Sequence, residues 1–469
     1  MIALLLSLHS AVALDRPAEI PEALEAKAFT VADPEFATLS NGMDVLVFSN
    51  HEMPLWEVRL VLGVGEYVDP AGKEGLAALA FALPQNGAGD RSSSQIAREL
   101  QLLGGQVSSS LKVDSAVIKA NGIKRNLPAI LDIWADVISE PTFAEEEFEI
   151  VRRSQVAQVN VDLTDPKKLS RRVVSKLMYG DDYIGRAPSV GSLEAINRDD
   201  VVSLYTQYAG PENAILLVGG DLTAEEVVPL LEERLGSWAP EAVEPAPVTA
   251  EPIPIEEEVI YFIDNPKASQ SVISSSTFID ENGGPDWTAI EVANHMFARA
   301  FTGRVMLNLR EDKAYSYGAR CYTNARHGVG SHMCRTSVRT NVTSKSLVEL
   351  RKEVEQVRGE NPLTEDEVSK SKEALAQKWP KTFETISSIL DQEFEIWRYG
   401  LSEDRVTEYI PDVRAIDTAQ ANAALQKWIL PDATFWLVVG DRAKVMKGLE
   451  EVGLPIVELD RSGSKINGK

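Results

Sequence analysis

The sequence predicts an α+β fold of two homologous α/β-sandwich domains, each a mostly antiparallel sheet covered by helices. Two observations support this prediction. Landmarks of the first half recur in the second half at a nearly constant spacing, and strands in the first half precede a block of helices. Between the halves, a Pro- and Glu-rich stretch lacks helical and strand periodicity, which is typical of a stiff, extended linker.

The recurrence is clearest around two Gly-Asp pairs. In each case a turn at proline leads into a buried apolar run, and the Gly-Asp pair then opens a helix. Pro211 and Pro431 lie 220 residues apart, and so do Asp221 and Asp441. This spacing indicates a duplicated unit.

A second pair of landmarks has almost the same spacing. Thr142 and Thr364 lie 222 residues apart, each three residues before a Glu, the pattern of a helix capping box. The alternative is that the boundaries between strands and helices in the two halves are similar by chance. The predicted organisation is a signal peptide at 1–13, a first domain at 14–238, a linker at 239–258 and a second domain at 259–469.

Periodicity predicts the elements of the first half in chain order. Strands are expected at 43–49 and 56–64, a helix that is apolar on all sides at 75–83, and an amphipathic helix at 92–103. An antiparallel strand pair at 107–111 and 115–122 and several helices over 125–207 follow.

The composition is that of a folded protein with an acidic surface. The 469 residues are 44% hydrophobic, and 71 acidic against 47 basic residues give a net charge of −24. Such a surface repels phosphate backbones, so no nucleic-acid partner is expected. It attracts a basic or extended peptide, although charge alone identifies no partner.

The first residues are typical of a secretory signal. An apolar run at 2–8 precedes the small residues Ala11-Val12-Ala13, which predicts cleavage after Ala13 and a periplasmic or secreted protein. No Lys or Arg precedes the run, so either the true start lies upstream or the export prediction is wrong. A membrane anchor fits less well, because a span needs about 20 apolar residues. No membrane span is expected elsewhere.

The two cysteines, Cys321 and Cys334, stand in β-prone stretches on either side of a turn near Gly328. A hairpin centred there would place them almost opposite each other. Two interpretations stay open: a cross-strand disulfide in an oxidising compartment, or two small buried thiols.

Several stretches between about residues 36 and 460 resemble the insulinase/pitrilysin family of zinc metallopeptidases, which includes the mitochondrial processing peptidase. They are LSNGMDVLV from Leu39, GVGE from Gly63, GLA from Gly75, LREDKAYSYG from Leu309 and, less closely, WPKTFET from Trp379. The resemblance implies the two-domain fold and a peptide substrate.

The family's catalytic motif is missing. Active members carry H-x-x-E-H directly after Gly-Leu-Ala: the two His bind zinc and the Glu activates water. Here the His positions are Ala78 and Ala82, the Glu position is Phe81, and the best match for the third ligand is Gln158. A methyl group has no lone pair for zinc and Phe takes no proton, so the resemblance implies a chain that binds no zinc and is inactive alone. Zinc is expected in a partner subunit.

A metal site elsewhere would need some of the five histidines, His9, His51, His295, His327 and His332. His327 and His332 flank the turn near Gly328 and could join Cys321 or Cys334 around a structural zinc. The spacing is not a recognised one, and surface turn histidines are the simpler interpretation.

The resemblance also implies two functional residues in the second half. In the family, an Arg and a Tyr seven residues apart line the active-site cleft; the Arg binds substrate backbone and the Tyr stabilises the oxyanion. Arg310 and Tyr317 keep that spacing, with Arg310 expected at the end of a helix over 298–309 and Tyr317 on the next strand. The strand period places Tyr315 on the same face as a further candidate. Alternatively, Arg310 caps a helix and Tyr317 is a packing aromatic.

We therefore predict a non-catalytic subunit of a heteromeric zinc metallopeptidase. A partner with an intact H-x-x-E-H motif would hold the zinc, and this chain would supply Arg310 and Tyr317. The first alternative is a peptide-binding or structural scaffold of the same fold without a peptidase role, for which an oxyanion donor has no use. The second is a self-sufficient peptidase with another metal site.

Overall fold

The computed structural model describes residues 31–466 except 32, 244, 246–248, 250 and 431–433. The predicted signal at 1–13, with His9, and the landmark Pro431 lie outside the described residues.

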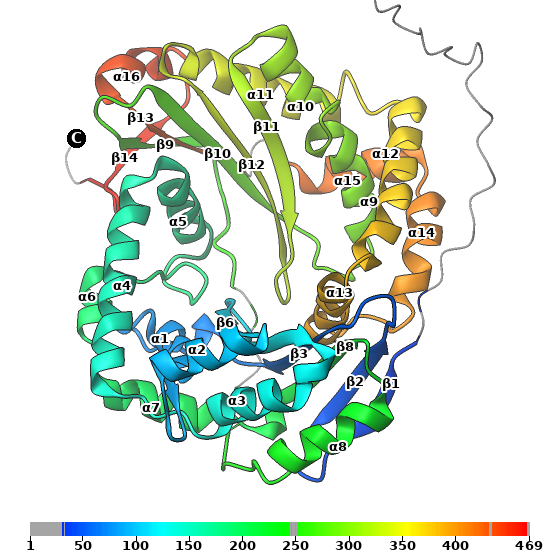
Figure 1. The fold of residues 1–469 in the computed structure, drawn as a ribbon. Helices are drawn as coiled ribbons and strands as arrows, with labels where there is room; N and C mark the ends of the chain where they lie inside the picture. The colour runs from blue at the N-terminus through cyan, green and yellow to red at the C-terminus, as the bar shows by residue number, and fades with distance from the viewer. Residues whose placement is uncertain are drawn as a thin grey trace, which may run out of the picture. The chain divides into compact units, whose positions relative to one another are not determined.

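The first half of the chain forms a six-stranded sheet in the order β1-β2-β8-β3-β7-β6 (Figure 1). Its strands are β1 (Glu35–Thr38), β2 (Asp44–Ser49), β3 (Leu55–Leu62), β6 (Gln106–Leu111), β7 (Ala116–Ile123) and β8 (Ala214–Gly220). Only β2 and β8 pair in parallel.

The second half forms another six-stranded sheet, in the order β11-β12-β10-β13-β9-β14. Its strands are β9 (Val259–Asp264), β10 (Gln270–Ile279), β11 (Ser316–Asn324), β12 (Gly330–Arg339), β13 (Phe435–Gly440) and β14 (Ile456–Leu459). Strand β9 pairs in parallel with both β13 and β14, and the other pairs are antiparallel.

Five strands of each sheet share one topology. The order β2-β8-β3-β7-β6 in the first half corresponds to β9-β13-β10-β12-β11 in the second, and the parallel pair comes first in both. The Gly-Asp pairs end equivalent strands, since Gly220 closes β8 and Gly440 closes β13. The predicted α+β fold of two homologous halves is confirmed.

Helices cover both sheets. Those of the first half are α1 (Leu76–Ala82), α2 (Ser93–Leu103), α3 (Leu127–Ser139), α4 (Glu145–Thr164), α5 (Pro166–Tyr179), α6 (Val190–Glu194), α7 (Arg198–Tyr208) and α8 (Ala224–Leu235). Those of the second half are α9 (Trp287–Asn294), α10 (Arg304–Met306), α11 (Thr343–Arg358), α12 (Glu365–Lys378), α13 (Ile386–Tyr399), α14 (Arg405–Ala415), α15 (Thr418–Trp428) and α16 (Arg442–Glu450). Within the described residues, no helix combines the length and the apolar character that a bilayer span requires. The described residues between 239 and 258 form neither helix nor strand.

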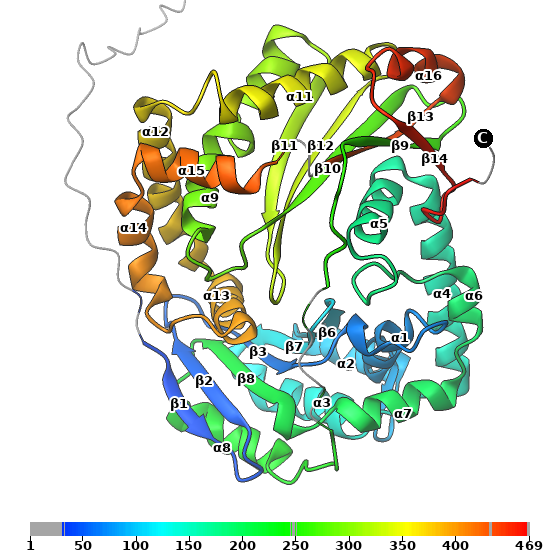
Figure 2. The same cartoon turned by 180° about the vertical axis from the view of Figure 1, so that it is seen from behind.

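Each half lends one helix to the other half's sheet (Figure 2). Helix α5 packs on β10 and β13, where Leu169, Val173 and Met178 share a core with Val272 and Leu437. Helix α13 packs in turn on β8 and β3. Each fully buried aliphatic side chain contributes about 1.5–3 kcal/mol, so this exchange joins the halves through apolar contact.

The α13 contact combines an apolar core with buried ion pairs. Arg59 on β3 lies 2.6 Å from Glu57 and 2.7 Å from Asp391 of α13, and the side chains of Arg59 and Glu57 are less than a tenth exposed. Arg398 of α13 lies 2.5 Å from Asp114, in the β6–β7 turn, and this pair is equally buried. Arg59–Asp391 and Arg398–Asp114 therefore connect α13 to the first sheet, and of these two pairs only Arg398–Asp114 is buried on both sides.

Two local predictions were wrong. Thr142 does not cap α4, whose N-cap is Ala144; its hydroxyl instead donates to the carbonyl of Gly87 at 3.1 Å. Thr364 does form the predicted capping box. The helix predicted over 298–309 is interrupted, because Ala300 and Gly303 are extended between two helical segments. A Cβ at Gly303 would lie 3.1 Å from the Ala300 oxygen, so this close turn favours glycine.

Candidate functional site

Helix α1 carries the residues expected to correspond to the family's metal helix. Its N-terminus is held by the buried carboxylate of Asp69, which accepts hydrogen bonds from the backbone N–H groups of Gly75 and Ala77, each at 2.7 Å. Burial raises the pKa of Asp69 to about 6. Gly75 adopts a left-handed conformation (φ 103°), which glycine adopts without steric penalty.

The side chains of α1 do not fit a metal. Ala78 and Ala82 are half-buried and four residues apart, on one face of the helix. Phe81 is buried and its ring centroid lies 5.6 Å from that of Tyr205, so the position of the family's general base is part of the hydrophobic core. Gln158 on α4 is exposed and donates from Nε2 to Asp162 at 2.6 Å. Methyl groups, a phenyl ring and an amide that is already bonded give zinc no adequate set of ligands.

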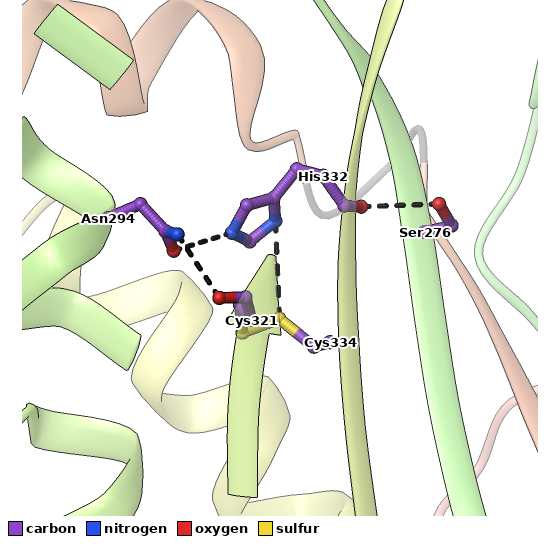
Figure 3. Close-up of a disulfide and its surroundings, with 5 residues drawn as sticks. All are labelled: Ser276, Asn294, Cys321, His332 and Cys334. Carbon is purple, nitrogen blue, oxygen red and sulfur yellow. Dashed lines mark hydrogen bonds between the residues drawn. A yellow bond between two sulfur atoms is a disulfide. The ribbon is translucent and has the colours of Figure 1, made fainter. Parts of the chain in front are cut away.

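A cluster of ligand-type residues lies on the β11–β12 hairpin (Figure 3). Cys321 and Cys334 are directly opposite in the strand register and form a disulfide. His332 is the third member of the cluster, the one group of three ligand-type side chains close enough for a metal among the described residues. Because both sulfurs are bonded to each other, they offer no thiolate to a metal. His327 lies apart, 3.5 Å from Asp114.

The His332 imidazole is buried and neutral. Asn294 of α9 donates from Nδ2 to the Cys321 carbonyl at 3.1 Å, which leaves its Oδ1 to accept from His332 Nε2 at 2.9 Å. Nε2 therefore carries the ring proton, and Nδ1 faces the Cys334 sulfur at 4.0 Å. Burial lowers the pKa of His332 to about 4.

Because the folded chain keeps His332 neutral, we expect the folded protein to lose stability in mild acid. Between pH 6.5 and about 4 the unfolded chain binds a proton at His332 that the folded chain excludes, so stability falls as the pH falls through this window. From pH 7 to pH 5, the wild-type free energy of unfolding should drop by about 2 kcal/mol more than that of a His332→Gln variant. Urea titrations at both pH values measure the difference, and parallel pH profiles would contradict the prediction.

Arg310 and Tyr317 line one surface depression of about 400 Å³. Arg310 belongs to a π-helical turn, Leu307–Asp312, that follows α10. Its guanidinium lies 4.5 Å from the centroid of the Phe301 ring and 3.1 Å from the Glu311 carboxylate. The sequence therefore identified two residues that the fold brings to the same place.

A β-bulge orients Tyr317. The pairing of β11 with β12 shifts between Ser316 and Ala319, and the Ser316 hydroxyl, which donates to the Ser337 carbonyl at 2.8 Å, accepts from Thr336 at 2.8 Å. Bulges redirect side chains, and Tyr317 is 90% exposed. Tyr315, expected on the face of Tyr317, instead packs against the hydrophobic core of the second half.

Three cationic residues at this depression were missed by the sequence analysis: Lys167, Arg320 and Arg335. The sequence held a signal for the two arginines. Arg320 precedes Cys321 and Arg335 follows Cys334, so a hairpin that places the cysteines opposite each other also places the arginines opposite each other. Lys167 gave no such signal, since it reaches the depression on α5, the helix that the first half lends to the second sheet.

Both the sequence and the fold are similar to those of known proteins. Residues 195–375 match the family described as the peptidase M16 inactive domain, and residues 44–187 match insulinase (peptidase family M16). An uncharacterized zinc protease of Rickettsia bellii is 26% identical over 204 residues, which are 42% of this chain and 49% of that protein. The chain spans about half the length of this and other curated relatives it matches.

Two further proteins show the range of the similarity. The beta subunit of the mitochondrial-processing peptidase of Mus musculus is 22% identical over 308 residues, 62% of this chain and 60% of that one. The peptidase M16 inactive domain from Pseudomonas fluorescens has a similar structure, with a TM-score of 0.80 and 20% identity over 87% of this chain and 98% of that one. The chain belongs to the insulinase family, peptidase family M16. Its sequence contains no H-x-x-E-H motif.

Proposed function

We propose that this chain is the non-catalytic subunit of a heteromeric zinc metallopeptidase. A partner of the same family with an intact H-x-x-E-H motif holds the zinc, and this chain supplies Arg310 and Tyr317 to the hydrolysis of a peptide. One observation carries the proposal: α1 has no ligand for a metal, whereas Arg310 and Tyr317 line the same depression.

The chemistry of the two side chains supports this assignment. A phenol hydroxyl donates a hydrogen bond to the oxyanion that forms when a peptide carbonyl is attacked, and it needs no proton transfer to do so. A guanidinium donates several hydrogen bonds in a fixed plane, which suits the carbonyl groups of an extended peptide. Arg310 is held in place by the Phe301 ring at 4.5 Å.

The exposure of Tyr317 is the second line of support. A tyrosine that is 90% exposed buries little of its ring, and tyrosines with one apolar and one polar end are enriched at interfaces. A partner subunit or a bound peptide would cover this ring. We further propose, from the residues at 1–13, that the protein functions in the periplasm or outside the cell.

Co-expression tests the proposal. The neighbouring gene is expected to encode a family member of similar length with H-x-x-E-H, and the two chains should co-purify as a complex with zinc-dependent peptidase activity. Each chain alone should be inactive or nearly so. N-terminal sequencing of the chain from its native source should find Leu14 first if the signal is cleaved as proposed.

The alternative is a scaffold or peptide-binding protein with no peptidase role. It predicts a complex that forms without gain of activity, or a chain that purifies without any H-x-x-E-H partner. Either outcome would contradict the shared active site. Peptide cleavage by the isolated chain, together with bound stoichiometric zinc, would contradict both interpretations.

A further inference from the structure

The depression beside Tyr317 is cationic, although the chain as a whole carries a net charge of −24. Of its twelve lining residues, all described, none is Asp or Glu. Four are cations that come from α5, the turn after α10, β11 and β12: Lys167, Arg310, Arg320 and Arg335. The charge of this surface is therefore opposite to that of the whole molecule.

Arg320 and Arg335 face each other directly across the β11–β12 pair. Like charges in this arrangement destabilise a strand pair. Some other arginines of the chain do pair with carboxylates, as Arg59 does with Glu57 and Asp391. Within the described part of the chain, no carboxylate lies within 4.0 Å of the Arg320 or Arg335 guanidinium. The two opposed arginines repel each other and so destabilise the strand pair. An anionic ligand between them would remove this repulsion.

The cationic surface continues beyond this depression. Arg320 and Tyr322 also line a neighbouring depression of about 470 Å³, where the Arg299 guanidinium lies 4.4 Å from the centroid of the Tyr322 ring. The one carboxyl group among the lining residues of that depression is Glu291, whose pKa burial raises. Three cations, Arg299, Arg320 and Lys378, line the same depression, so cations outnumber carboxylates there as well.

We propose that Arg320 and Arg335, with Lys167, bind a carboxylate of the peptide substrate and so select peptides with an acidic residue near the scissile bond. This inference rests on the proposed function, because it takes the peptide to lie beside Tyr317. Guanidinium groups bind carboxylates through paired, charge-assisted hydrogen bonds. The acidic remainder of the surface is screened beyond about 8 Å at physiological ionic strength, so the local cations determine selectivity at this place.

Binding to the isolated chain tests the carboxylate site without any need for activity. Short fluorescent peptides that differ only by Glu or Gln at one central position, each with an amidated C-terminus, are titrated by anisotropy. The Glu peptide should bind about tenfold more tightly. The same Gln peptide with a free C-terminus shows whether a terminal carboxylate serves equally well. Equal affinity for the Glu and amidated Gln peptides would overturn the inference, and so would displacement of the Glu peptide by equimolar inorganic phosphate.

Variants locate the site. In the Arg320→Gln/Arg335→Gln double variant, the Glu and Gln peptides should bind equally. The Arg98→Gln/Arg125→Gln variant is the matched control, because it removes the same charge from exposed positions on α2 and before α3; it should keep the tenfold preference. A preference that survives in the first variant places the carboxylate elsewhere. The comparison of peptides on the wild-type chain stands even if a variant fails to fold.

The outcomes separate this inference from the proposed function. If the complex has no peptidase activity but the chain alone binds the Glu peptide through Arg320 and Arg335, the carboxylate site stands and the shared active site fails. If the complex is active and depends on Tyr317 but its kcat/KM is the same for Glu and Gln peptides, the shared site stands and the carboxylate site fails.

Discussion

Replacing Tyr317 by phenylalanine is expected to lower kcat of the assembled peptidase about 100-fold, with little change in KM or in zinc content. The substitution keeps the ring and removes only the hydroxyl. Loss of one donor to an oxyanion typically costs about 3 kcal/mol of transition-state stabilisation. The ground-state peptide lacks that negative charge, so the effect falls on kcat. Steady-state kinetics of the co-purified complex measure it.

A matched control separates this role from a general effect of losing a hydroxyl. Tyr208→Phe makes the same substitution on α7 in the first half and should leave kcat unchanged. Arg310→Ala should raise KM, since its guanidinium is assigned to the peptide backbone. If Tyr317→Phe and Arg310→Ala both leave activity at the wild-type level, the second half of this chain takes no part in catalysis.

Replacing Arg59 by alanine should destabilise the fold by about 3 kcal/mol, because it leaves Glu57 buried beside the α13 contact without its closest partner. Removal of one member of a buried pair costs about 3–5 kcal/mol. We expect the lower end, since Lys119 remains 4.0 Å from Glu57. Urea unfolding measured by circular dichroism gives the change.

An exposed ion pair provides the control for Arg59→Ala. Lys370 lies 2.5 Å from Asp366 on α12, and both side chains are more than half exposed. Such helical pairs contribute about 0.3–0.5 kcal/mol, so Lys370→Ala should destabilise the fold by no more than about 0.5 kcal/mol. If Arg59→Ala is as mild as Lys370→Ala, the buried network does not hold α13 on the first sheet.

Features that depend on neighbouring residues in the sequence were largely predicted. The antiparallel pair expected at 107–111 and 115–122 is β6 and β7, and the amphipathic helix expected at 92–103 is α2 with Ser92 as its N-cap. Alternation along a strand and the 3.6-residue period of a helix are local properties, so they can be read without knowing the fold. The predicted helix over 298–309 failed because the close turn at Gly303 depends on the carbonyl groups folded around it.

The candidate site divides in the same way. The family resemblance pointed to Arg310 and Tyr317, and the structure places both at one depression. The sequence gave no indication that Lys167 also lines this depression, because only the fold shows that α5 packs on the second sheet. The face chosen for Tyr315 was wrong because the bulge at Ser316 breaks the alternation on which that choice depended.

By itself, the sequence determined the duplicated α+β fold and the absence of metal ligands on α1, since both depend on which residues are present and how they are spaced. Only the tertiary structure decided that α5 packs on the second sheet and α13 on the first, and that four cationic residues line the depression beside Tyr317. The physical reason is that apolar attraction has no direction. A periodic apolar face shows that a helix will be buried, and the competition among all available surfaces decides which sheet buries it.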